Sequence, residues 1–187
     1  MKSINKNELI SELTEICLSC KEKAIIWKSI PKIKLTASPQ EGKWSADQCI
    51  EHLNRYFDYY LPEIEKTISS TVETDNKADF RPGKLGDYFA KSMKISGVKV
   101  NKMKTFKSKN PAIDLKVREN NLELFIQNID EIINYLSKSR DKNLERLRTP
   151  VSISVLIKLK LGDTFRFVVY HIERHIIQAE KALEKII

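Results

Sequence analysis

The chain has 187 residues, 41% of them hydrophobic and 31% charged, and its formal net charge is +8. A chain of this length buries roughly two-thirds of the surface that it exposes when unfolded, so it needs no disulfide bonds to form a core, and we expect one domain over residues 1–187. Five glycines and six prolines are too few for the many tight turns of a β-sandwich, which excludes that class and favours long helices. No apolar run approaches the roughly 20 residues of a membrane span, and the N-terminal residues lack the apolar region of a signal peptide, so we expect a soluble, cytoplasmic protein.

The first two long helices are expected at about residues 5–30 and 45–70. Apolar residues recur in both at steps of three and four, which is the spacing of one helix face. Ser45 and Gln48 have the S-x-x-Q spacing of a capping box and mark the start of the second helix. Pro62 lies inside this helix and is expected to kink it, because its ring removes one backbone hydrogen bond.

Two further long helices are expected at about residues 118–139 and 163–187, the latter capped by Asp163 or Thr164. The intervening connection at residues 71–117 is far longer than antiparallel neighbours need, which indicates a crossover that lets the second and third helices run parallel. The sequence therefore predicts an all-α fold, a four-helix bundle with a long crossover between helices two and three.

Two shorter segments complete the pattern. Residues 85–93 are expected to form a short helix within the crossover. Residues 152–159 are apolar and β-branched, and their pattern suits either a short helix or a strand.

The chain contains three histidines, His52, His171 and His175. His171 and His175 are four residues apart on the last helix, so they differ by about 40° around its axis and about 6 Å along it. Neutral imidazole binds borderline ions such as Zn²⁺ and Ni²⁺, and three such ligands leave one coordination position open for water or a thiol. The pattern is compatible with a divalent metal site, but the same spacing is at least as common where histidines only pack in a core.

Four residues near the histidines in the sequence bear on this site. Glu173 is two residues after the first histidine of H-I-E-R-H, about 200° around the helix, so it should point away, unlike the glutamate of the H-E-x-x-H zinc motif. Gln178 suits either a hydrogen bond at the site or a place on the polar rim. We interpret Tyr56 as a core residue and Trp44 as the closure of one end of the bundle.

Three stretches of the sequence resemble motifs of the DinB-like (DinB/YfiT) superfamily. They are G-K-W-S-x-x-Q-x-x-x-H-L at 42–53, K-M-K-T-F-K-S-K-N-P at 102–111, and L-G-D-T-F-x-x-x-x-x-H-x-x-R-H-x-x-Q at 161–178. The resemblance implies a four-helix bundle that holds a divalent metal ion, most often nickel or zinc, through His52, His171 and His175. Gln48 stands where an acidic residue is common, which leaves the metal pattern intact.

The resemblance also implies a type of activity. Some members of the superfamily are thiol S-transferases that use bacillithiol or related low-molecular-weight thiols, others resemble metal-dependent hydrolases, and homodimers are frequent. We therefore expect a metal-dependent thiol transferase or hydrolase with a small-molecule substrate, and a homodimer. The alternative is a helical bundle that binds a metal or ligand without catalysis.

The segment from Tyr88 to Ile113 contains seven lysines and no acidic residue. Such a stretch can attract nucleic acid, but it shows neither interleaved aromatic residues nor a recognised DNA-binding motif. We interpret it as a solvated loop and expect no nucleic-acid partner. The seven residues are Lys91, Lys94, Lys99, Lys102, Lys104, Lys107 and Lys109.

The three cysteines are Cys17, Cys20 and Cys49. The first two form C-L-S-C, a spacing found in redox pairs and in half of a zinc site. Because both lie on or beside an apolar helix stripe, we interpret them as buried, inert thiols.

Overall fold

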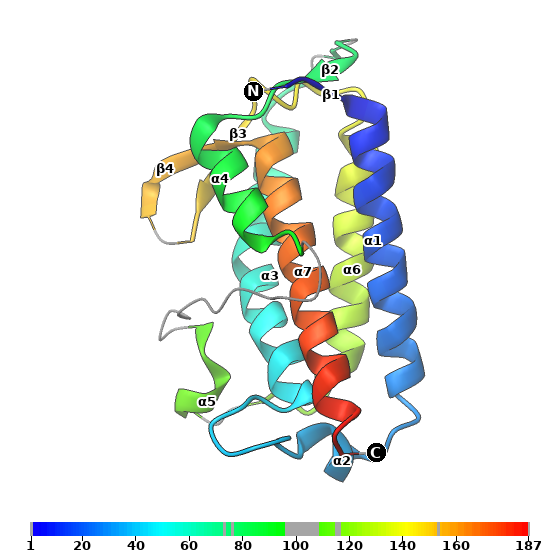
Figure 1. Cartoon of the computed structure of the whole chain (residues 1–187). Coiled ribbons are helices and arrows are strands. Elements are labelled where there is room, and N and C mark those ends of the chain that lie inside the picture. Colours follow the sequence, from blue (N-terminus) through cyan, green and yellow to red (C-terminus); the bar gives the residue numbers. More distant parts are fainter. Residues whose placement is uncertain are drawn as a thin grey trace.

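The computed structural model describes residues 2–72, 74–75, 77–95, 109–114, 117–152 and 154–186. Four long helices of this described chain form a bundle in which α1 and α3 each pack against α6 and α7 (Figure 1). These helices are α1 (Lys6–Trp27), α3 (Ala46–Ser69), α6 (Asn121–Lys138) and α7 (Leu161–Leu183). Shorter helices are α2 (Lys32–Thr36), α4 (Lys84–Met93) and α5 (Pro111–Asp114). Strands β1 (Ile4–Asn5) and β2 (Asp79–Phe80) pair antiparallel, as do β3 (Arg148–Val151) and β4 (Ser154–Lys160).

Helices α3 and α6 run parallel, as hydrogen bonds at both of their ends show. Near their first residues, Asn121 donates to the Asp47 carbonyl at 2.8 Å and to its carboxylate at 2.9 Å. Beyond their last residues, the Asp75 amide donates to the Asp141 carbonyl at 2.6 Å. The predicted all-α bundle with a long crossover between its second and third long helices is confirmed, and α4 lies within that crossover as predicted.

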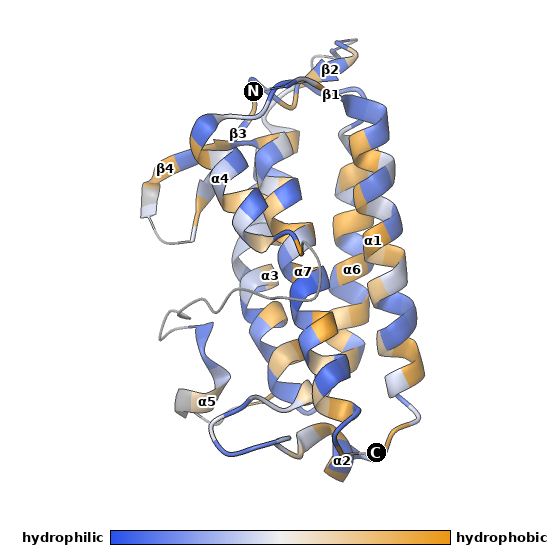
Figure 2. Ribbon diagram, in the orientation of Figure 1, coloured by the Kyte–Doolittle hydropathy of each residue, from blue (hydrophilic) through white to orange (hydrophobic). Residues whose placement is uncertain are grey.

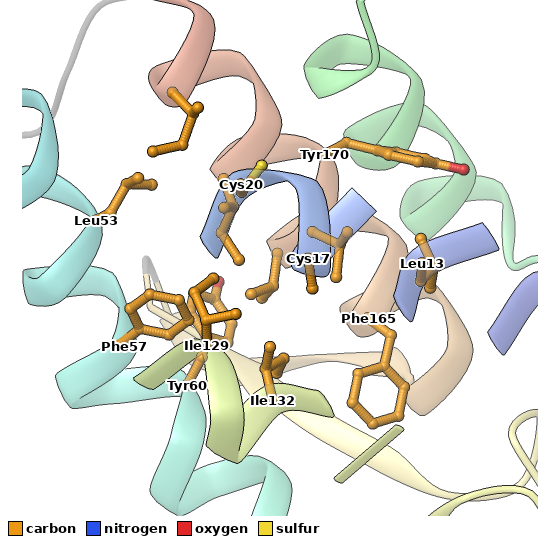
Figure 3. Close-up of a cluster of buried hydrophobic side chains, with 14 of the residues drawn as sticks. Leu13, Cys17, Cys20, Leu53, Phe57, Tyr60, Ile129, Ile132, Phe165 and Tyr170 are labelled. Atoms are coloured by element: carbon orange, nitrogen blue, oxygen red, sulfur yellow. The ribbon is translucent and has the colours of Figure 1, made fainter. Parts of the chain in front are cut away.

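The bundle helices are amphipathic, with hydrophobic and hydrophilic residues on each of them (Figure 2). Their apolar faces meet in a core to which all four contribute (Figure 3). Leu13 from α1, Phe57 from α3, Ile129 from α6 and Phe165 from α7 are at most 2% exposed. Full burial of such a side chain stabilises the fold by about 1.5–3 kcal/mol, so this core fixes how α3 and α7 face each other.

Helix α3 begins as the capping box predicts. The Gln48 amide donates to Ser45 Oγ at 3.2 Å, and the Ser45 amide donates to Gln48 Oε1 at 3.0 Å. The helix continues through Pro62 to Ser69 without interruption, so the proline does not end it.

The predicted cap of α7 is wrong. The helix begins at Leu161 after Lys160, whose side chain makes no capping hydrogen bond. Asp163 lies in the first turn, where its carboxylate accepts from Arg166 at 3.0 Å and from the Gly83 amide at 2.7 Å. The aspartate therefore fastens the start of α4 to α7 instead of capping α7.

The undecided segment at residues 152–159 is largely strand. Within β4, Leu159 pairs with Thr149 of β3 and is 4% exposed. Among the described residues, no helix has the length and apolarity that crossing a membrane requires. Of the lysine-rich stretch and the motif at 102–111, residues 96–108 lie outside the described residues.

All three cysteines are free and buried, as predicted. Burial raises the pKa of Cys20 to about 12 and those of Cys17 and Cys49 still further above the ordinary thiol value. Because the thiolate is the reactive form, these thiols are unsuited to chemistry at neutral pH.

Candidate metal centre

Helices α3 and α7 bring the three histidines together. His52 lies near the start of α3, and His171 and His175 lie on consecutive turns of α7. The His52 ring centroid is 5.1 Å from that of His171 and 4.4 Å from that of His175, and the latter two are 4.6 Å apart. One ring nitrogen from each lies within 4.8 Å of the other two. With exposed fractions of 2%, 4% and 8%, the rings form a buried cluster.

The tautomer of His52 follows from its hydrogen bond. Its Nδ1 lies 2.6 Å from the Lys109 carbonyl oxygen, which can only accept, so Nδ1 carries the proton and donates. The Nε2 atom therefore keeps its lone pair, the form in which imidazole binds metals. It is 3.1 Å from His171 Nε2. Two imidazole nitrogens bound to one ion at about 2.0–2.1 Å lie about 2.9–3.4 Å apart for bond angles near 90–110°.

His175 supplies a further sign that the cluster fits a cation. Its Nδ1 atom is buried and has no hydrogen-bond partner in the part of the chain that the structure describes. A buried polar atom left unsatisfied costs about 1–3 kcal/mol, and an ion bound there would remove that cost. A side-chain hydrogen bond with Gln178 raises the pKa of His175 and is the weakest influence on it. Gln178 therefore lies at the cluster and not only on the rim.

All three imidazoles are neutral at pH 7. Burial lowers the pKa of His52 to about 4, because it outweighs the opposing effect of the hydrogen bond to the Lys109 backbone and is reinforced by the charges of Lys109 and Arg55. Burial, the neighbouring histidines and the Arg174 guanidinium lower the pKa of His171 and His175 well below their ordinary range. A neutral imidazole has an available lone pair, so the donor set suits a divalent ion.

Aromatic rings surround the cluster. The Tyr56 ring centroid is 4.4 Å from that of His171, and that of Phe167 is 5.9 Å from it. Burial raises the pKa of Tyr56 to about 12, so the phenol is protonated. Trp44 lies just before the first residue of α3 and packs against the core; its ring also lies 4.9 Å from that of His52 and so forms a wall of the site.

Sequence reasoning overlooked two residues of this site and correctly placed a third away from it. Phe167 is four residues before His171 on the same helix face, a spacing that could have identified it. Lys109 is 57 residues from His52 and carried no signal beyond its charge. Glu173 faces away as predicted, since burial and charged groups of α1 and Lys94 govern its pKa.

Comparisons with known proteins agree with this architecture. A family model of the DinB superfamily matches residues 24–179. No curated protein matches the sequence. The solved structure of YfiT from Bacillus subtilis, described as a probable metal-dependent hydrolase with an unusual four-helix bundle topology, is similar with a TM-score of 0.53. The two are 13% identical, and the match covers 95% of this chain and 85% of that one, so this likeness concerns the fold alone. On the family match, the chain belongs to the DinB superfamily.

Proposed function

We propose that the protein is a divalent-metal-dependent enzyme in which His52, His171 and His175 hold the ion, with nickel or zinc as the expected metal. The observation that carries this proposal is the buried cluster of three neutral imidazoles, one of which has an orphaned nitrogen. Three neutral ligands leave the ion its full charge and a position free for substrate.

The residues around the cluster define what the site would do. A bound divalent ion supplies Lewis acidity, which favours the deprotonated form of a water or thiol beside it. Trp44, Tyr56 and Phe167 provide apolar walls that keep bulk water from the rings. The charges that lower the pKa of these rings come from Lys109, Arg55 and Arg174, all cations, and Arg55 is itself paired with Glu51 at 2.8 Å.

Two reactions use such a nucleophile. Activation of water gives a hydrolase, the activity ascribed to YfiT, and activation of a low-molecular-weight thiol gives an S-transferase. Either acts on a small-molecule substrate. A homodimer, a cytoplasmic location and a single domain over residues 1–187 stay predictions, which light scattering, fractionation and limited proteolysis would test.

A second candidate function is a bundle that holds a metal without catalysis. The low exposure of the three rings, at most 8%, favours it, because a sealed ion cannot exchange substrate. The two functions differ in turnover that depends on the metal.

The test is elemental analysis of protein purified without chelator. We expect about one nickel or zinc ion per chain in the wild type and in Glu173→Ala, a matched variant on the other face of α7, and loss of the ion in His171→Ala. Wild-type protein that stays metal-free after incubation with either ion would refute the metal site. Ester hydrolysis and thiol conjugation to electrophiles, measured before and after metal removal, then separate enzyme from binding protein.

A further inference from the structure

Lys109 lies two residues before the start of α5 and contacts α3 at two points one helical turn apart. Its carbonyl oxygen accepts from His52 Nδ1 at 2.6 Å. Its ammonium group donates to the Arg55 carbonyl and lies 5.7 Å from the centroid of the Tyr56 ring. One residue of the crossover is therefore attached to α3 by both its backbone and its side chain.

The backbone contact determines the state of His52. A carbonyl accepts only from the Nδ1–H tautomer, so it turns the Nε2 lone pair toward His171 and His175 and makes that nitrogen a better donor to a metal. A free imidazole is not restricted to this tautomer. The benefit therefore depends on the carbonyl staying within hydrogen-bond distance of the ring.

The side-chain contact holds that carbonyl in place. Its acceptor belongs to α3, the helix that carries His52, so the ammonium fixes Lys109 relative to the ring that its own carbonyl contacts. Burial lowers the pKa of Lys109, in agreement with an ammonium group held against the helix and not extended into solvent.

We propose that Lys109 is a positioning residue for the histidine cluster: its ammonium anchors it to the Arg55 carbonyl so that its own carbonyl holds His52 as the Nδ1–H tautomer. The consequence for metal affinity rests on the proposed function, whereas the consequence for the tautomer does not.

Three variants separate anchoring from simple packing. Lys109→Met keeps a long, unbranched side chain against Tyr56 but removes the N–H donors. Lys109→Arg keeps a cationic donor and should rescue the wild-type properties. Lys84→Met makes the same replacement at an exposed lysine of α4 and serves as the matched control.

The experiment is ¹⁵N–¹H correlation NMR of metal-free protein labelled at the histidine rings, with His52 assigned by its loss in His52→Gln. We expect the Nδ1–H pattern for His52 in wild type, Lys109→Arg and Lys84→Met, and a mixed or Nε2–H pattern in Lys109→Met. Zinc competition titrations should then show affinity reduced about tenfold in Lys109→Met alone, the lower end of the effect of outer-shell partners.

Thermal unfolding of each variant verifies that it is folded under the conditions of both measurements. A His52 that stays fully Nδ1–H in Lys109→Met would overturn the inference. A tautomer change that leaves zinc affinity at the wild-type value would support the positioning of His52 and refute only its consequence for metal affinity. A wild type that binds no metal would refute the proposed function alone, because the tautomers of the metal-free proteins would still decide the role of Lys109.

Discussion

Replacement of Gly86 by alanine should separate α4 from α7. A Cβ at Gly86 would lie 2.4 Å from three atoms of Asp163, one of them the aspartate's own Cβ. Asp163 cannot retreat, because its carboxylate is held by the Gly83 amide at 2.7 Å and by Arg166 at 3.0 Å. An ordinary contact needs about 1 Å more, so the two helices must move apart at this point.

The change in the free energy of unfolding follows from two effects that destabilise the variant and one that stabilises it. Overpacking costs about 1–3 kcal/mol, and weakening of the hydrogen bonds to the Asp163 carboxylate costs up to about 1.5–3 kcal/mol. Alanine is favoured over glycine inside a helix by about 1 kcal/mol, which is the smaller term. We expect Gly86→Ala to lower the free energy of unfolding by about 2–3 kcal/mol, which for this length is a fall in Tm of about 5–10 °C.

Urea unfolding followed by circular dichroism measures this change. Tyr88→Ala is the matched control, because Tyr88 lies on the same helix and is 68% exposed, and such surface changes usually stay within about 0.5 kcal/mol. A Gly86→Ala variant as stable as wild type would refute the reasoning that close packing against Asp163 requires glycine here.

Three other predictions concern groups whose partners the structure identifies. Because burial lowers the pKa of His52 to about 4, the unfolded chain binds a proton at this residue at a higher pH than the folded protein does, so metal-free protein should lose stability as the pH falls from about 6.5 toward 4. In urea titrations at pH 7 and 5, the loss of unfolding free energy between the two pH values should be about 2 kcal/mol smaller for His52→Gln than for wild type. Equal losses would contradict a lowered pKa of His52. Burial raises the pKa of Glu145, but the hydrogen bonds from Lys77 and Lys160 outweigh this effect and lower the pKa to about 2. The carboxylate therefore contributes to stability above about pH 4.5, and this contribution is lost toward pH 2. A Glu145→Gln variant should show a shallower acid denaturation curve between these values, and an unchanged curve would speak against the ion pairs. Asn121→Ala leaves the Asn54 amide and the Asp47 carbonyl without the bonds at 2.7 Å and 2.8 Å, so it should cost about 1–3 kcal/mol in chemical denaturation, and a neutral substitution would show that water replaces the lost amide.

The architecture could be predicted because it depends on patterns within each segment. Apolar residues at steps of three and four identified all four long helices, and the Ser45–Gln48 capping box located the start of α3. The length of the connection then indicated a crossover and the parallel course of α3 and α6. None of these inferences required knowledge of which side chains meet across helices.

The failures have the opposite character, because each depends on a distant partner. Asp163 has the residue type of a helix cap, but Gly83 and Arg166 compete for its carboxylate. The strand β4 is determined by pairing with β3, which an apolar and β-branched run does not reveal. Lys109 adjoins the histidine cluster only through its contact with His52, which is 57 residues away along the chain.

The histidines are intermediate between these cases. Their spacing on α7 could be read from the sequence, whereas the meeting of His52 with His171 across two helices depends on how α3 and α7 pack. The structure brings the three rings together.

A crystal structure of the natively purified protein, with diffraction data on both sides of the nickel and zinc absorption edges, tests the central claim most directly. The account predicts one anomalous peak per chain, at about 2.0–2.1 Å from one ring nitrogen of each of His52, His171 and His175. A peak elsewhere, a peak that omits one of these rings, or a fully metal-free cluster in protein incubated with both ions would contradict it.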